Sequence, residues 1–389
     1  MPEDDYMGND ATRKLRYAMV GGGPGSFIGG VHRASIALNG SAYLVAGCFS
    51  QTPEKNRQTG RENELDPDRV YDTFQLMAEK EALRKDKPDF VVITAQNYAH
   101  YDACKAFLSN GFHVMCEKPL TTTVKQALEL KELSEKNGLL LGVSYTYAGH
   151  VMVMEARNLI KRGELGEILV VMGEYPQDWL IGMVEGASHG ISSWRLDPVI
   201  TGGSNCTGDI GTHVEHTVSY MTGLRIKKLC AVLDKVGDGT VLDNNAHVLI
   251  KYENGATGTY WSSQVAIGNE NALRVRIYGT EGAIEFDQEN CNYLTFVKKG
   301  RPHQILSRGC EYLTPGAVAY NRIPPGHLEG HHVAFANLYV AFIEDIRRVL
   351  RGEAPTKADY PGVDDGVDGV KFIEKCLESA NNGNCWVSY

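Results

Sequence analysis

Short apolar runs alternate with amphipathic stretches over residues 16–144. A parallel sheet that is covered by helices on both faces gives this pattern, because its strands are buried on both sides. The pattern therefore predicts a doubly wound α/β (Rossmann) domain at residues 15–145, after a flexible tail at residues 1–14. The expected strands are residues 17–20, 43–49, 90–94, 113–116 and 139–143, and the expected helices are residues 73–84, 98–109 and 124–136, the last capped by the threonines at 121–123.

The rhythm changes after an expected helix at residues 151–161, where β-like runs follow one another without helices between them. Turn signals such as Glu253-Asn254-Gly255 fall where hairpins need them. Residues 146–389 are therefore predicted to form an α+β domain with a large, mostly antiparallel open sheet, which binds substrate and forms oligomers. The expected strands are residues 168–175, 228–236, 246–252, 257–264, 273–278, 283–286 and 293–297, and helices at 329–350 and 367–379 close the chain.

The composition is that of an ordinary globular protein, with 43% hydrophobic and 22% charged residues in a chain of 389. Glycine is in excess at 42 residues but has no period, so we assign the excess to turns. A net charge of −9 without a basic stripe argues against nucleic acid as a partner. A polar start and the lack of a long apolar run argue against a membrane partner, and we expect a cytoplasmic protein.

Glycines gather where the first expected strand ends and a helix begins. A dinucleotide pyrophosphate needs backbone N–H groups at a helix N-terminus, with no side chains in the way. The strict G-x-G-x-x-G pattern is broken, because Ser26 stands three positions after Gly23 and the next glycine is Gly29. Either the loop is longer than usual or it is a tight turn. We expect cofactor contacts from Gly21, Gly23, Pro24, Gly25, Ser26, Phe27 and Ile28.

The end of the second expected strand bears on the choice of cofactor. An NAD site usually has an acidic residue there, which accepts hydrogen bonds from the adenosine ribose. This chain has Ser50 instead, which can bond a plain ribose, and no carboxylate repels the 2'-phosphate of NADP. Lys55 or Arg57 can reach such a phosphate, or both can be solvated helix residues. The residues leave NAD(H) and NADP(H) open, and we favour NAD(H).

Three further residues have the chemistry of alcohol oxidation. Lys118 follows a buried strand and precedes a proline, so it emerges at the sheet edge where doubly wound folds bind ligands. Asp209 and His213 are one turn apart on an expected helix, and an imidazole is the usual general base for this reaction. Alternatively, Lys118 is a surface lysine, Asp209 is an N-cap and His213 is a structural histidine.

The order of these motifs resembles the Gfo/Idh/MocA oxidoreductases, named for glucose-fructose oxidoreductase and inositol dehydrogenase. The resemblance runs from Arg16 to the last helix and rests on the glycine loop, Glu117-Lys118-Pro119 and the segment 208–213, GDIGTH. It implies that Lys118, Asp209 and His213 surround the reacting carbinol. It also implies cofactor contacts from Asn97, His100, Glu117, Lys118, Trp194 and Arg195.

The implied reaction is hydride transfer between a nicotinamide cofactor and a secondary ring hydroxyl of a sugar, glycoside or inositol, as in a glucoside 3-dehydrogenase or an inositol dehydrogenase. His213 would take the hydroxyl proton, Lys118 would stabilise the alkoxide, and Asp209 would orient the base or bind a neighbouring hydroxyl. The expected substrate contacts, beyond these three, are Tyr145, Tyr147, Gln177, Trp179 and, by resemblance, His327.

Two alternatives stay open at this point. Asp209, His213 and His216 have spacing that permits a divalent metal in a hydrolase or isomerase, although this does not explain the glycine loop. The chain can also be a non-catalytic regulator that binds NAD(P). His327 and His331 resemble a metal pair without a third ligand, and we expect no metal. The uncovered face of the second sheet predicts self-association, and the family resemblance implies a homodimer or homotetramer.

Overall fold

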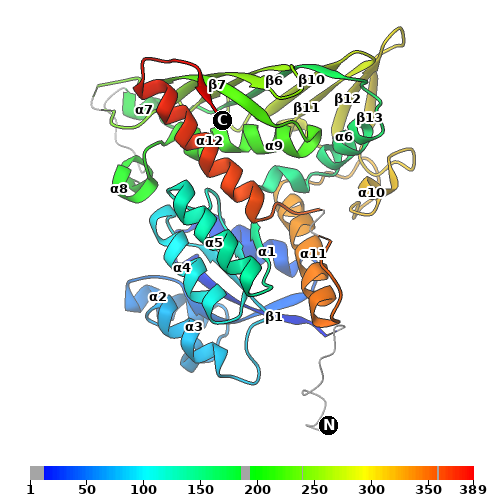
Figure 1. The fold of residues 1–389 in the computed structure, drawn as a ribbon. Helices are drawn as coiled ribbons and strands as arrows, with labels where there is room; N and C mark the ends of the chain where they lie inside the picture. The colour runs from blue at the N-terminus through cyan, green and yellow to red at the C-terminus, as the bar shows by residue number, and fades with distance from the viewer. Residues whose placement is uncertain (1–12, 185–192, 239, 357–358) are drawn as a thin grey trace.

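A parallel five-stranded sheet forms one half of the computed structural model (Figure 1), which describes residues 13–184, 193–238, 240–356 and 359–389. The strand order β2-β1-β3-β4-β5 places the topological switch point between β1 and β3, where doubly wound folds bind ligands. The predicted Rossmann architecture is thereby confirmed. Its elements are β1 (Leu15–Gly21), α1 (Phe27–Ala37), β2 (Ala42–Cys48), α2 (Pro53–Glu62), α3 (Phe74–Ala82), β3 (Phe90–Thr94), α4 (Asn97–Ser109), β4 (His113–Cys116), α5 (Val124–Lys136) and β5 (Leu141–Val143).

Helix starts in this half follow the capping residues of the sequence. The Thr123 hydroxyl accepts a hydrogen bond from the Gln126 N–H at 3.3 Å, so the predicted threonine cap of α5 is confirmed. The helix α2 has no apolar period, because its buried residues are Asn56, Thr59 and Gly60. Of the predicted flexible tail, residues 1–12 lie outside the described part, and Arg13 is bound to Asp89 at 2.5 Å.

A nine-stranded sheet forms the other half, in the order β13-β12-β11-β10-β6-β9-β8-β7-β14. All its pairs are antiparallel except β6 with β9, so the predicted mostly antiparallel sheet is confirmed. The sequence pattern missed β13 and β14, which are short edge strands. The strands are β6 (Ile168–Pro176), β7 (Ile226–Asp234), β8 (Asn245–Tyr252), β9 (Thr257–Ser263), β10 (Arg274–Gly279), β11 (Gly282–Asp287), β12 (Tyr293–Lys298), β13 (Gln304–Ser307) and β14 (Val387–Ser388).

Helices cover one face of the nine-stranded sheet (Figure 1), whereas on the other face the described residues leave apolar side chains exposed. The helices α6 (Val151–Lys161), α9 (Thr212–Thr222) and α12 (Val363–Asn381) all lie on the face toward the Rossmann half (Figure 1). Buried and exposed side chains alternate along β8. The exposed ones lie on the outward face, where Leu249 is 49% exposed. Met172 of β6 and Leu249 of β8 share a row across the sheet, because both pair with Thr259. Apolar side chains therefore line an open surface.

The two halves are joined by the closing helices. The helix α11 (His331–Leu350) packs on the Rossmann sheet, with Phe342 buried against Phe90. In Figure 1 the helix α12 runs from the nine-stranded sheet down to α5. The carboxyl ends of the parallel strands consequently face the second half. Among the described residues, no helix is long and apolar enough to cross a bilayer.

Candidate active site

A cavity of about 960 Å³ lies between the halves, at the carboxyl ends of the parallel strands. This is the position where doubly wound folds bind ligands. Residues from the glycine loop, the strand ends and the segment 194–213 meet in it. Of the residues singled out in the sequence, those that line the cavity are Gly21, Gly23, Pro24, Gly25, Ser26, Phe27, Ile28, Ser50, Lys55, Asn97, His100, Glu117, Lys118, Tyr147, Gln177, Trp194, Arg195, Asp209, His213 and His331.

The glycine loop forms a close-packed cradle at the N-terminus of α1. A Cβ on Gly23 would lie 2.8 Å from the Phe49 carbonyl oxygen, and a Cβ on Gly29 would lie 2.3 Å from the Gly22 Cα. Gly29 therefore allows the close packing of helix and loop that the third glycine gives in G-x-G-x-x-G, three positions later than in the strict pattern. The Ser26 hydroxyl caps α1 through the Gly29 N–H at 3.3 Å. The loop is longer than the standard one, and it fits a dinucleotide pyrophosphate.

The end of β2 carries no acidic residue toward the cavity. Ser50 and Lys55 both line the cavity there, and the only acidic lining residues among those described are Glu117 and Asp209, which belong to other strands and helices. Arg57 lies outside the lining and pairs with Glu54 at 3.4 Å.

Glu117 is a buried anchor rather than an exposed acid. Its carboxylate accepts a hydrogen bond from His32 Nε2 at 2.9 Å and another from the Ser144 hydroxyl. Burial by itself raises the pKa of Glu117, but His32 and Lys118 lower it overall, so the side chain is ionised. His100 is held in a similar way, because its two ring nitrogens contact the carbonyl oxygens of Pro119 and Ala95 at 2.8 and 3.0 Å. Both residues fix the loop that carries Lys118.

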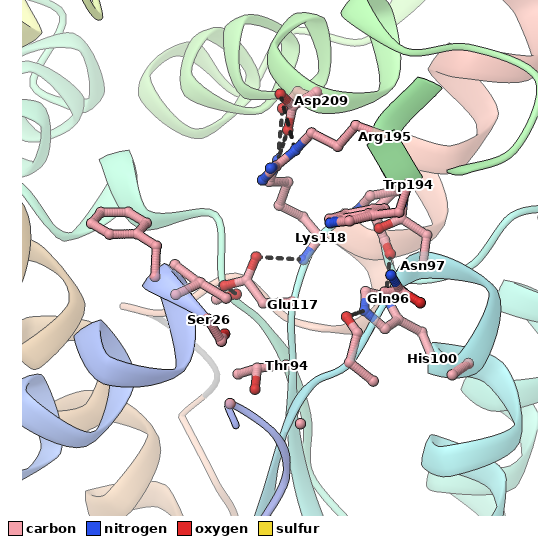
Figure 2. A pocket seen from close by; sticks show the side chains of 18 of the residues that line it. Ser26, Thr94, Gln96, Asn97, His100, Glu117, Lys118, Trp194, Arg195 and Asp209 are labelled. Atoms are coloured by element: carbon pink, nitrogen blue, oxygen red, sulfur yellow. Dashed lines mark hydrogen bonds and ion pairs between the residues drawn. The ribbon is translucent and has the colours of Figure 1, made fainter. Parts of the chain in front are cut away.

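Lys118 and Asp209 form an ion pair across the cavity. The Lys118 ammonium donates to Asp209 Oδ1 at 2.8 Å and to the Asp209 carbonyl oxygen at 2.7 Å. Figure 2 shows Arg195 reaching toward the same carboxylate, from which its Nε is 4.0 Å away, while Trp194 lies above Asn97. Burial raises the pKa of Asp209, but Lys118 and Arg195 outweigh it and hold that pKa well below its usual range. The Asp209 carboxylate is thus ionised.

The helix that carries Asp209 differs from the predicted one. Residues Thr207–Gly211 form a π-helical turn before α9 begins at Thr212. Such turns are frequent at functional sites. Asp209 is not the N-cap of α9, because its carboxylate binds Lys118 and accepts a hydrogen bond from Gln264 Nε2 at 3.2 Å. The side chain is held from two sides.

His213 lies beside this pair as a neutral imidazole. It is 8% exposed, and burial first and the Lys118 ammonium second hold its pKa well below 6.5. Its Nδ1 has no hydrogen-bond partner within the described part of the chain. The ring packs edge-on against Tyr147, at 4.8 Å between centroids. A neutral imidazole at the cavity can accept a proton.

The wall of the cavity beside His213 is polar and aromatic. Tyr147 and Tyr175 bond to each other through their hydroxyls, and Tyr175 donates to Asn271 Oδ1 at 2.5 Å. Gln177 donates to the same oxygen at 2.8 Å. Four side chains from distant parts of the chain therefore form one hydrogen-bonded surface with groups that can bond hydroxyls.

Three of the predicted substrate contacts lie away from the cavity lining. Tyr145 is fully buried and stacks on His216 at 4.4 Å. Trp179 lies behind Gln177 and donates to its side-chain oxygen at 3.0 Å. His327 is exposed on the loop before α11, and its carbonyl oxygen accepts a hydrogen bond from Arg308 at 2.5 Å. None of the three lines the cavity.

The residues proposed for a metal do not converge. Asp209 faces Lys118, whereas His216 faces Asp365 at 3.5 Å on the far side of Tyr145. Over the described ranges, no group of three His, Cys, Asp or Glu side chains is arranged to hold a metal ion.

Several lining residues were not found from the sequence, among them Tyr175, Asn205 and Asn271. Tyr175 is the last aromatic residue of β6 and stands two positions before Gln177, which is only a weak indication that it lines the cavity. Amide side chains such as Asn205 and Asn271 lie far apart in the sequence and carry no mark of their chemistry.

Comparisons with known proteins agree with this geometry. Residues 15–145 match the model of an oxidoreductase family with an NAD-binding Rossmann fold, and residues 153–285 match the GFO/IDH/MocA C-terminal domain. An uncharacterized oxidoreductase of Bacillus subtilis is 37% identical over 97% of this chain and 98% of that protein. A levoglucosan dehydrogenase of Pseudarthrobacter phenanthrenivorans is 29% identical over 52% of this chain and 57% of its own length.

A solved structure is similar over nearly the whole chain. An inositol dehydrogenase homolog from Azotobacter vinelandii, in complex with NAD⁺, has 37% identity and a TM-score of 0.93, and the match covers 98% of this chain and 100% of that one. The same homolog in complex with NADH and myo-inositol has a TM-score of 0.90, with 97% of this chain covered and 100% of that one. Both halves of the chain match, and the chain belongs to the Gfo/Idh/MocA oxidoreductases, with an NAD-binding Rossmann domain.

Proposed function

We propose that this protein is an NAD(H)-dependent dehydrogenase that oxidises a secondary ring hydroxyl of a cyclitol or sugar. One observation carries the proposal: the neutral His213 and the Lys118–Asp209 ion pair lie in the same cavity as the glycine loop. A base, a cation and a dinucleotide site in one cavity are the parts that alcohol oxidation needs.

The substrate class is supported by the cavity and by the relatives. A ring of hydroxyls matches the hydrogen-bonded wall of Tyr147, Tyr175, Gln177 and Asn271. The Azotobacter vinelandii homolog binds myo-inositol, and the Pseudarthrobacter relative acts on the sugar levoglucosan. Both compounds are rings that carry secondary hydroxyls.

The cofactor would be held by the glycine loop and the ends of β2 and β3. Gly23, Gly25 and the N-terminus of α1 would hold the pyrophosphate, since side chains are absent where phosphates need backbone N–H groups. Ser50 would bond the adenosine ribose, which supports NAD(H), while the lack of an acid and the nearby Lys55 leave room for NADP(H). When bound, the nicotinamide accepts the hydride from the carbinol carbon.

His213 would act as the general base. As the carbinol C–H bond breaks, the imidazole takes the proton of the hydroxyl, so that the carbon–oxygen single bond becomes a carbonyl. The low pKa of His213 keeps this imidazole free of a proton at neutral pH, as burial and Lys118 dictate. Tyr147 holds the ring orientation by edge-on contact.

Lys118 would stabilise the alkoxide that develops on the substrate oxygen. Asp209 keeps the ammonium in place through a 2.8 Å bond. Glu117 and His100 fix the loop on which Lys118 stands. This arrangement places the positive charge beside the base before the substrate enters.

The outward face of the nine-stranded sheet supports self-association. Met172, Leu249 and other exposed apolar side chains line this face, and large uncovered apolar surfaces mark interaction sites. We propose a homodimer or homotetramer that is formed through this sheet.

The test is the reduction of NAD⁺ and NADP⁺, followed by nicotinamide absorbance, over a panel of myo-inositol, D-xylose, levoglucosan and methyl β-D-glucopyranoside. We expect turnover of at least one ring polyol, faster with NAD⁺. Tight binding of NADH without turnover of any polyol would instead support a non-catalytic NAD(P)-binding regulator. Stoichiometric zinc or manganese in the purified protein, without reduction of either cofactor, would support a metal-dependent hydrolase or isomerase.

A further inference from the structure

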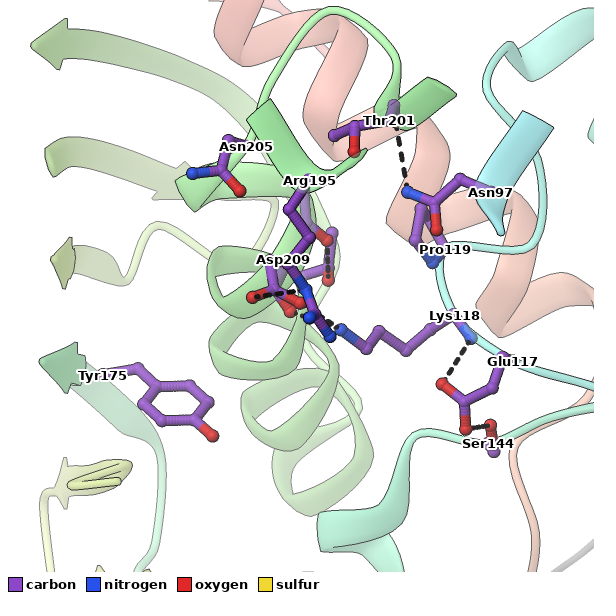
Figure 3. A network of polar contacts seen from close by, with 12 residues as sticks. Asn97, Glu117, Lys118, Pro119, Ser144, Tyr175, Arg195, Thr201, Asn205 and Asp209 are labelled. Carbon is purple, nitrogen blue, oxygen red and sulfur yellow. Dashed lines mark hydrogen bonds and ion pairs between the residues drawn. The ribbon is translucent and has the colours of Figure 1, made fainter. Parts of the chain in front are cut away.

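Asn205 presents an unpaired acceptor at the cavity. It is 1% exposed, lines the cavity and stands four residues before Asp209. Its side-chain oxygen Oδ1 has no hydrogen-bond partner among the residues that the structure describes. Figure 3 shows Asn205 and Tyr175 on one side of Asp209 and Lys118 on the other. A buried amide oxygen without a donor is a group that a ligand can satisfy.

The orientation of the Asn205 amide follows from the charge of Asp209. Held ionised by Lys118, the Asp209 carboxylate only accepts hydrogen bonds, so Gln264 must turn its NH₂ group toward it, at 3.2 Å. The Gln264 oxygen then faces Asn205, which must donate through Nδ2, at 2.7 Å. Both amide groups are thereby fixed, and Asn205 Oδ1 is left to face away from Gln264.

The backbone of Asn205 is held as firmly as its side chain. The buried Asp243 carboxylate accepts hydrogen bonds from the Asn205 N–H at 2.9 Å and from the Thr207 N–H at 2.8 Å. Gln264 itself is fully buried, so neither end of the relay can turn into solvent. Asn205 Oδ1 is thus a preorganised acceptor.

We propose that Asn205 Oδ1 accepts a hydrogen bond from a second hydroxyl of the polyol, close to the carbinol that is oxidised. The inference rests on the proposed function and deepens it, because it makes Asn205 a specificity-determining residue. Asn205 selects a hydroxyl donor, and rejects at that ring position both a hydrogen and a fluorine, since fluorine only accepts. A site built to bond a hydroxyl strongly disfavours analogues that lack it.

The experiment measures binding rather than turnover. Isothermal titration calorimetry of the protein–NADH complex is run with each panel polyol and with its monodeoxy and deoxyfluoro analogues. For the wild type, we expect one ring position at which fluorine for hydroxyl weakens binding by about 10- to 100-fold. In Asn205→Ala the same exchange should weaken binding by less than about threefold, because the acceptor is gone.

A second variant tests the inference if Asn205→Ala does not fold. Gln264→Met keeps the volume but releases the Asn205 amide, which can then rotate and present its NH₂ group. The affinity for every polyol should fall. In addition, the preference for hydroxyl over fluorine at that ring position should shrink, which a merely structural role of Gln264 would not produce. Asn137→Ala, on the Rossmann surface with its amide bonded to the Leu108 carbonyl, is the matched control and should keep the wild-type preference.

The outcomes separate the two proposals. The Asn205 inference is overturned if fluorine weakens binding equally in wild type and both variants, or if no polyol binds the NADH complex. A different result would contradict the proposed function: polyols bind with the selectivity expected for Asn205, but no hydride is transferred to NAD⁺.

Discussion

Replacing Lys118 with methionine removes the cation from the centre of the proposed site. The substitution breaks the two hydrogen bonds to Asp209, at 2.7 and 2.8 Å. At an effective dielectric constant of about 20, a pair 2.8 Å apart is worth roughly 6 kcal/mol before desolvation is deducted. The two side chains are 14% and 22% exposed, so we expect a net loss of stability near the lower end of the ~3–5 kcal/mol range for broken buried pairs.

The same substitution should move the titration of the base. Burial is the main cause of the low pKa of His213 and the Lys118 ammonium is the second, whereas Asp209 raises this pKa. Without Lys118 the ammonium no longer opposes protonation, and the Asp209 charge is no longer neutralised. Both effects raise the pKa of His213, so the acid limb of kcat/KM should shift to higher pH.

The assay is the initial rate of NADH formation over roughly pH 5 to 10. For Lys118→Met we expect kcat to fall by about 10²- to 10³-fold, the usual loss for one oxyanion donor, together with the upward shift of the acid limb. Lys136→Met, an exposed lysine at the end of α5, is the control and should behave as wild type. An acid limb that stays in place, or moves to lower pH, would refute the electrostatic reasoning.

Three further predictions follow from other parts of the molecule. Burial and nearby carboxylates raise the pKa of Glu215 to about 8, so the folded state keeps a proton that the unfolded state loses. The free energy of unfolding should therefore decline by up to about 5 kcal/mol as the pH rises from about 5 to 8. Glu215→Gln should flatten this decline in thermal melts. Gly29→Ala should weaken NADH binding by about tenfold or more in a fluorescence titration, because its Cβ has no room, whereas Gly30→Ala, with nothing within 4 Å, should bind normally. Leu249→Lys should dissociate the oligomer in light scattering, and an unchanged mass would argue against association through this face.

The Rossmann half was predictable because its central strands are buried on both sides. The strand at residues 90–94 is buried at every position, so its apolar run stands out in the sequence and both ends were found. In the second half, buried and exposed residues alternate along β8, and this alternation made the strand equally easy to predict. The short edge strand at residues 304–307 is exposed or half-buried throughout, and its sequence carries no such pattern.

The site was predictable only where local context marks a residue. Lys118 follows a buried strand and precedes a proline, and the glycine loop follows another strand, so both could be found. Gln264 and Asn271 come after β9 and before β10, and they reach Asp209 and Tyr175 only through the pairing of β6 with β9 and β10. Amide side chains that act through such long-range contacts give no signal in a single sequence.

The central claim is that His213 is the base of an NAD-dependent oxidation. Its most direct test is the turnover number of His213→Ala on the best substrate of the panel, with NADH affinity measured in parallel. We expect kcat to fall by about 100-fold or more while the dissociation constant of NADH stays at the wild-type value. An unchanged turnover number would contradict the assignment of His213 and, with it, this account of the site.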